Sequence, residues 1–181
     1  MFKNVIPTLK YAWLTLRHKV YVFQAGLKLK VPLWRLITHD LSKFYPNQLP
    51  HYGRQFFGSK NDPHGFIKCW IRHQNKEDHH WEWWIPRTGH NRCTPIYPDM
   101  CPVAMSEGAV REMLADWMGA SRAYEGKWPD PHYWDWFTKA FCKMDLHADT
   151  RVMILDIIKK IWGFVPVDGE DFEVRVSHKP D

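Results

Sequence analysis

The pattern of apolar and polar positions predicts an all-helical chain with one long irregular stretch. The first helix is expected to run from about Pro7, a residue that suits a first turn, to about Lys28. One of its faces is apolar and consists of Leu9, Ala12, Trp13, Leu16, Val20, Phe23 and Leu27. The opposite side carries Tyr11, Leu14, Val22 and Ala25 around His18. We therefore expect this helix to be buried on both faces, with His18 pointing inward.

Helix start and stop signals divide the rest of the chain. Pro32 can begin a second helix that ends near Lys43 or Phe44, so that the pair His39-Asp40 would fall in its last turns. Residues 47–61 are expected to form a loop or a short helix. Later helices are predicted after Asp62-Pro63, from the N-cap Ser106 to Tyr124, from Asp130-Pro131 to about Met144, and from Thr150 to Trp162. Between them, the proline-rich stretch from Ile85 to Pro102 is long enough to be a functional loop.

Composition indicates one domain, residues 1–162, followed by an extended tail, residues 163–181. The chain has 181 residues, 45% hydrophobic content and a mean hydropathy of −0.49, which is enough to build one core. The net charge of +5 suits anionic ligands but is too small and too dispersed to favour nucleic acid. No apolar run reaches transmembrane length. A homo-oligomer is compatible with this composition.

Cysteine usage favours a reduced, cytoplasmic location. The four cysteines are spread singly, without a C-x-x-C motif or a secretory leader. His90, Cys93 and Cys101 are a candidate structural zinc site, but the sequence does not indicate a fourth ligand.

The pair His39-Asp40, with Lys43 three residues later, is the strongest chemical signal. An adjacent imidazole and carboxylate can hold a divalent cation, and the lysine can neutralise an anionic substrate. Adjacent side chains diverge by about 100° on a helix, so both reach one ion only near a helix end or with partners from other helices. The candidate partners are His18, His73, His79, His80 and Asp116.

Asp116 is expected at the margin of the inward face of its helix. Gly119 and Ala120 lie beside it, and such small residues let another helix approach closely. A carboxylate on a semi-buried face must be paired or bind a metal. A salt bridge to an arginine remains the alternative.

The order His18, His39-Asp40, then Asp116 resembles that of the metal-dependent HD superfamily, a helical-bundle fold. The resemblance implies that these four residues hold one metal ion. It also implies that His73 with His79 or His80 corresponds to the extra histidines of members with two metals, such as cyclic-dinucleotide phosphodiesterases and mixed-valent di-iron oxygenases. Lys43 matches the lysine of their HD-x-x-K element.

Three elements are more closely similar to those of an uncharacterised family of small HD-like proteins from bacteria and phages. They are His39-Asp40-Leu-Ser-Lys43-Phe44, His79-His80-Trp-Glu82-Trp-Trp84 and Glu112-Met-Leu-Ala-Asp116-Trp. The resemblance as a whole spans roughly Leu9 to Trp162. Ser42 stands where a glycine is usual, and the segment from His73 to His80 is shorter than in two-metal relatives, so the number of ions stays open.

The expected chemistry follows from these residues. Imidazole and carboxylate ligands suit Mn, Fe, Zn, Co or Ni ions, one or two of them, better than Mg or Ca. Asp40 and Lys43 are the expected catalytic pair, while Glu82 is a candidate general base or a support for a ligand histidine. In addition to Lys43, Arg122 is a candidate residue for contacting the phosphate of the substrate.

Three functions remain open on the sequence alone. The first is a metal-dependent phosphohydrolase that acts on a nucleotide or another small phosphorylated metabolite. The second is an HD-type di-iron oxygenase, because the extra histidines and the HD-x-x-K element are shared. The third is a non-catalytic binding or structural protein whose histidines only satisfy hydrogen bonds in the core.

Overall fold

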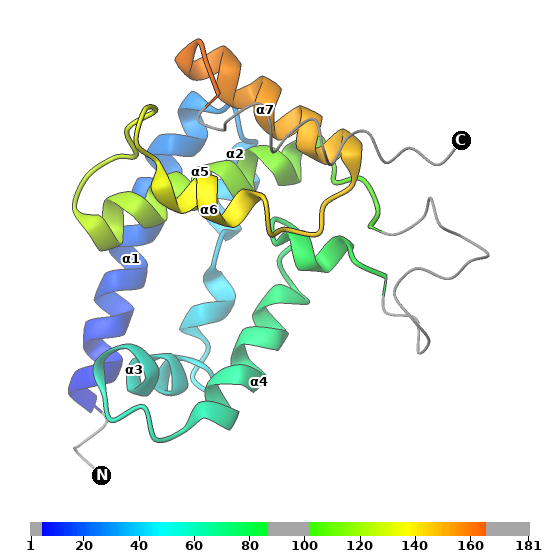
Figure 1. Ribbon diagram of the computed structural model, residues 1–181. Coiled ribbons are helices and arrows are strands. Elements are labelled where there is room, and N and C mark those ends of the chain that lie inside the picture. Colours follow the sequence, from blue (N-terminus) through cyan, green and yellow to red (C-terminus); the bar gives the residue numbers. More distant parts are fainter. Residues whose placement is uncertain (1–4, 87–101, 166–181) are drawn as a thin grey trace.

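The computed structural model describes residues 5–86 and 102–165, and within them it is a packed bundle of helices without strands (Figure 1). The all-α prediction is therefore confirmed. The elements are α1 (Val5–Lys28), α2 (Leu33–Thr38), the 3₁₀ turn η2 (Leu41–Phe44), α3 (Leu49–Phe57), α4 (Pro63–Gln74), the 3₁₀ turn η3 (Trp81–Trp84), α5 (Glu107–Glu125), α6 (Asp135–Phe141) and α7 (Ala148–Trp162).

The close packing of α1 against α5 organises the bundle. At the crossing, a Cβ atom added to Gly119 would lie 2.6 Å from Val22 Cγ2 and 2.8 Å from the Val22 backbone nitrogen. The two helices can approach this closely only because Gly119 has no side chain. The expectation that the small residues beside Asp116 admit another helix is therefore confirmed.

The core consists of two apolar clusters. The larger one is built from one half of α1 with α2, α5, α6 and α7, and Phe137 and Ile154 are fully buried within it. The smaller one joins α1, α3 and α4 through Tyr11, Tyr52 and Cys69. Figure 1 shows α3 and α4 at one end of α1 and the other helices toward its opposite end. Along α1, the buried polar residues Thr15 and His18 lie between Tyr11 of the smaller cluster and Val22 of the larger one.

The structure corrects the predicted orientation of α1. The buried stripe of this helix is Tyr11, Thr15, His18, Val22 and Ala25, so His18 does point inward. The more apolar stripe faces outward, and Trp13 and Leu9 are 66% and 63% exposed. The helix is thus buried on one face and not on two. The covered face is the one whose polar groups find partners.

Several predicted helix ends also differ. The second helix stops at Thr38 rather than near Lys43, because the chain turns sharply at Asp40 before η2. The helix expected from Asp130 begins only at Asp135 and ends at Phe141, since Asp130 caps a turn by accepting from the His132 N–H.

The other starts agree more closely with the sequence. Asp62 and Ser106 cap α4 and α5, because their side chains accept from the backbone N–H groups of Gly65 and Ala109. Residues 47–61 contain the short helix α3.

Some expectations concern residues outside the described parts. Most of the proline-rich loop, the candidate zinc residues His90, Cys93 and Cys101, and the tail beyond Val165 lie there. Among the described residues, no helix has both the length and the apolar character needed to cross a membrane.

We predict that Gly119→Ala destabilises the protein by about 1–3 kcal/mol, because its methyl group would meet the backbone of Val22 and push α1 away from α5. Gly108→Ala is the matched control in the same helix, since its nearest new neighbour, Arg35 Cδ, would be 3.8 Å away. Helix propensity should make that variant neutral or slightly more stable. Urea unfolding followed by circular dichroism gives both values, and equal effects would contradict this account of the crossing.

Candidate metal centre

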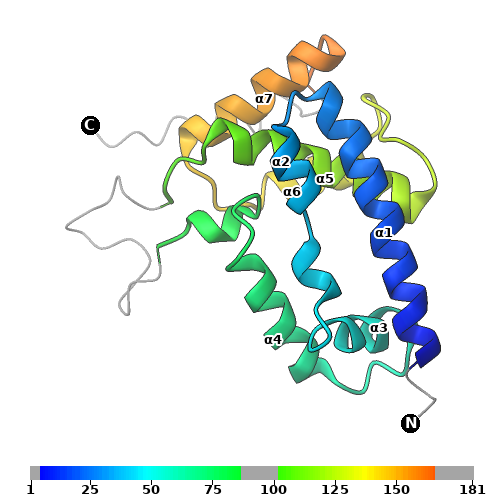
Figure 2. The same cartoon turned by 180° about the vertical axis from the view of Figure 1, so that it is seen from behind.

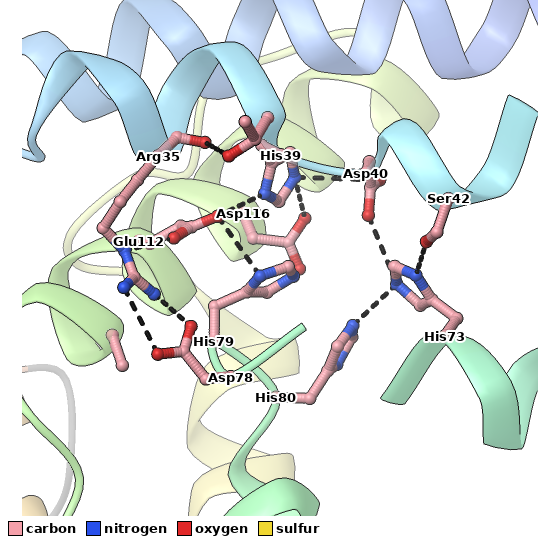
Figure 3. A network of polar contacts seen from close by, with 12 residues as sticks. Arg35, His39, Asp40, Ser42, His73, Asp78, His79, His80, Glu112 and Asp116 are labelled. Carbon is pink, nitrogen blue, oxygen red and sulfur yellow. Dashed lines mark hydrogen bonds and ion pairs between the residues drawn. The ribbon is translucent and has the colours of Figure 1, made fainter. Parts of the chain in front are cut away.

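A sharp turn brings His39 and Asp40 to the same place. His39 is the C-cap of α2, and Asp40 has φ 58° and ψ 11°, in the left-handed region. Because α2 ends before this pair, the two side chains do not diverge as they would on a helix. His39 is 1% and Asp40 0% exposed. Figure 3 shows both facing the interior between α2, α4 and α5.

The first group of possible ligands consists of His18, His39, Asp40 and Asp116. One ligand atom from each lies within 4.8 Å of the others. His18 Nε2 is 2.8 Å from Asp116 Oδ1 and 3.4 Å from Asp40 Oδ2, and His39 Nε2 is 3.4 Å from the same Asp116 oxygen. The four residues predicted to share one ion are thus brought together from α1, the α2–η2 turn and α5.

The second group consists of His73, His79 and His80. His73 Nε2 lies 2.8 Å from His80 Nε2 and 3.2 Å from Asp40 Oδ1. Asp40 therefore faces the first group with Oδ2 and the second with Oδ1. All seven residues predicted as metal ligands lie in this one region.

Glu112 links the two groups and was not predicted as a functional residue. Its Oε1 is 2.9 Å from His39 Nδ1 and 3.2 Å from His79 Nδ1, and its Oε2 accepts from Arg35 Nε at 2.6 Å. Arg35 is also paired with Asp78. Glu112 precedes Asp116 by four residues, which places both carboxylates on one face of α5. That spacing is the signal by which the sequence could have revealed it.

These bonds determine which imidazole nitrogens face the centre. Glu112 engages Nδ1 of His39 and of His79, and Ser42 engages Nδ1 of His73 at 2.8 Å. The Nε2 atoms of His39 and His79 are buried and have no hydrogen-bond partner among the described residues. A histidine fixed through one ring nitrogen and open at the other is the usual arrangement of a metal ligand. The donor set therefore fits a transition metal ion.

The charges of the centre are also compatible with a bound cation. Burial acts to raise the pKa of Asp116, but the ion pairs with His18 and His39 outweigh it and hold that pKa well below its usual range. Burial likewise opposes protonation of His39, yet the nearby carboxylates of Asp40, Asp116 and Glu112 raise its pKa to about 10. The buried carboxylates thus draw positive charge onto the imidazoles. A bound divalent ion would supply that charge instead.

The centre opens into a cavity of about 360 Å³. Lys43 lines this cavity and donates to Asp40 Oδ2 at 2.7 Å. The walls are largely aromatic and include Tyr11, Tyr52, Phe56, Phe66, Trp70, Trp81, Trp117 and Tyr124. Glu82 also lines it, and its Oε2 is buried with no hydrogen-bond partner among the described residues.

The structure does not bring Arg122 to this cavity. Its guanidinium donates to the Gly126 carbonyl at the end of α5 and lies over the Tyr21 ring. Arg122 thus closes the helix end and makes no contact with the candidate ligands. Arg122 follows Asp116 by six positions, which sets the two side chains about 120° apart on a helix and agrees with this position.

Comparisons with known proteins identify a family but no activity. The model of a family described as "Family of unknown function (DUF5662)" matches residues 8–160, which contain every residue of the centre. No curated protein and no solved structure matches the chain.

We predict that the purified protein contains a transition metal and that Asp116→Ala loses most of it, because Asp116 faces both His18 and His39. His64→Ala, which changes an exposed histidine of α4, should keep the wild-type metal content. Elemental analysis by mass spectrometry measures both. The metal centre would be rejected if the wild type held no transition metal as purified and took up none on reconstitution.

We predict that Glu112→Gln lowers metal affinity by about 10- to 100-fold, because the amide cannot hold both imidazole N–H groups and the Arg35 guanidinium as a carboxylate does. Glu107→Gln is the control on the same helix, since Glu107 is exposed and pairs only with Arg111 among the described residues. Competition with a metal-binding dye gives the affinities. Equal values for the two variants would show that Glu112 does not orient the ligands.

Proposed function

We propose that this chain, which belongs to the family of unknown function DUF5662, is a metal-dependent phosphohydrolase that acts on a nucleotide or another small phosphorylated metabolite. The observation that carries the proposal is the position of the ligand groups beside Lys43 and the aromatic cavity. A metal alone would fit many roles. A metal, a buried cation and a cavity of small-molecule size together favour hydrolysis of an anionic substrate.

A borderline transition metal is the ion we expect here. The ligand set is mainly imidazole with two carboxylates, which favours Mn, Fe, Co, Ni or Zn over Mg and Ca. When bound, such an ion lowers the pKa of a coordinated water and polarises a phosphoryl oxygen. The two groups that share Asp40 support two ions, as in the HD members with extra histidines.

Lys43 is the residue that we expect to contact the phosphate. Its side chain is buried but reaches the cavity, and it contacts a carboxylate that also faces the ligand imidazoles. A compact ammonium at this point can neutralise the oxygens of a phosphate held at the metal. The Tyr52 hydroxyl, which is buried without a hydrogen-bond partner among the described residues, lines the same cavity and offers a further donor.

Glu82 is the residue that we expect to move a proton. It lines the cavity from η3, next to the histidines of the second group. Its free carboxylate oxygen is available to a water molecule or to a leaving group in the cavity. Burial raises its pKa, which brings proton exchange closer to neutral pH.

The aromatic walls support a substrate with a flat, apolar part. Phe66 and Trp70 of α4 and Trp81 of η3 line the cavity together with Trp117 and Tyr124 of α5. A cavity of this volume lies at the lower end of the range for small-molecule sites, about 300–1,000 Å³. A nucleoside or a comparable organic group attached to the phosphate is flat enough to stack on these aromatic walls and small enough for this volume.

A di-iron oxygenase is the second candidate function. The observation that favours it is the second histidine group, which lies directly beside the first and shares Asp40 with it. Metal analysis separates the two functions: two irons per chain with visible absorption bands favour the oxygenase. Other transition metals together with phosphatase activity favour the hydrolase.

We predict that Lys43→Met keeps its metal but loses about 100-fold in kcat/KM on a phosphorylated substrate, because a phosphate at the metal would lose its charge partner. The measurement combines metal analysis with phosphate release from a panel of nucleotides and phenyl phosphates.

Lys68→Met, which removes an exposed lysine of α4, is the control and should remain fully active. Unchanged activity of Lys43→Met would reject the role of Lys43. Failure of the metal-loaded wild type to hydrolyse any member of the panel would contradict the proposed function.

A further inference from the structure

The exposed face of α1 has a regular spacing. Its large apolar residues alternate in steps of three and four, and they are Ile6, Leu9, Trp13, Leu16, Val20, Phe23 and Leu27. All seven are exposed, from 36% at Phe23 to 66% at Trp13. We call these seven residues the α1 seam. A stripe that keeps a period of 3.5 residues over three repeats is the signature of a helix that packs lengthwise against another helix.

The α1 seam is not needed for the fold of the chain itself. The opposite stripe of α1, with Tyr11, His18 and Val22, makes the contacts with the rest of the bundle. Lys19, at the edge of the seam, donates to the carbonyls of Ile37 and His39, which ties α1 to α2. Figure 2 shows α2 beside α1 on the same side of the molecule. The helix is therefore held in place, while none of the residues that the structure describes covers its most apolar face.

The area of the α1 seam is that of a stable protein interface. Large side chains have areas of roughly 150–250 Å², so the exposed fractions amount to on the order of 700 Å² of apolar surface. The largest apolar patch on a typical monomer is about 300–600 Å². A standard interface buries about 800 Å² on each partner. Leu33, Trp34 and Ile37 of α2, the helix beside α1, are also exposed.

We infer that the α1 seam is a dimer interface, in which α1 packs against α1 of a second copy of this chain, parallel and in register. In the heptad positions a to g, the a residues are Ile6, Trp13, Val20 and Leu27, and the d residues are Leu9, Leu16 and Phe23. β-Branched residues at a with leucine at d favour two-stranded packing. Ile6 and Val20 with Leu9 and Leu16 follow that rule.

The charged residues beside the seam agree with the parallel arrangement. Each e position then faces the g position five residues earlier in the second copy. Lys10 meets Val5, Arg17 meets Ala12, and Gln24 meets Lys19, so no two cations oppose each other. If the two α1 helices packed antiparallel about the middle of the seam, Arg17 of one copy would face Arg17 of the other. The seam lies opposite His18, so pairing leaves the candidate metal centre uncovered.

Sedimentation of the full-length protein at micromolar concentration tests the interface. The wild type should have twice the chain mass of 21.7 kDa. Leu16→Glu should be a monomer, with a dissociation constant raised at least about 100-fold, because a charge would be buried between two apolar stripes. Tyr133→Glu, at a position 80% exposed outside the seam, is the matched control and should stay a dimer. Circular dichroism and metal content should match the wild type in both variants.

A cross-link tests the parallel register without a disruptive charge. Leu9→Cys lies at a d position, so mild oxidation should join two copies covalently, whereas the wild type treated in the same way should remain uncrosslinked. A monomeric wild type, a dimeric Leu16→Glu or an uncrosslinked Leu9→Cys would overturn the inference. Flotation of a monomeric wild type with anionic phospholipid vesicles, lost in Leu16→Glu, would overturn it in favour of a membrane contact.

Discussion

The close approach of α1 to α5 is the contact on which the rest of the structure depends. Gly119 lies against the backbone of Val22, and the residues of the candidate centre lie one turn away on each helix. His18 precedes Val22 by four positions, and Asp116 precedes Gly119 by three. Residues with these spacings share a helix face, so the crossing that leaves no room for a Cβ atom also sets His18 2.8 Å from Asp116. The packing of α1 against α5 therefore also determines the distance between the candidate ligands on these two helices.

The turn at Asp40 is the second constraint, and it has an energetic cost. A residue other than glycine in the left-handed region costs on the order of 1–3 kcal/mol, although aspartate tolerates it better than most residues. Lys43, His18 and His73 contact the two carboxylate oxygens and hold the turn in place. The same contacts explain why an acidic residue is needed here: glycine would relieve the strain but would leave the imidazoles and the ammonium without their shared partner.

Local signals predicted most of the helix starts, although not that of α6, and they did not predict which distant residues meet. Asp62 and Ser106 act over three residues, so their capping role is visible in the sequence. The covered face of α1 was not predictable, because both faces repeat every seven residues and the usual preference selects the more apolar one. The histidine side is the buried one, since Tyr11, Val22 and Ala25 pack into the two clusters and His18 pairs with Asp116 of α5. The contact between Glu112 and His39 was not predicted from the sequence either, because the two residues are 73 positions apart along the chain.

The separation of the ligand residues along the chain has a consequence for folding. His18 and Asp116 are 98 positions apart (116 − 18) and meet in one contact. The entropy lost on closing so long a segment must be offset by the apolar packing of α1 against α5, which spans a similar separation, so we expect the centre to assemble together with that contact. Anything bound there joins four distant segments at once. Its binding free energy then adds to the stability of the entire bundle rather than to that of any one helix.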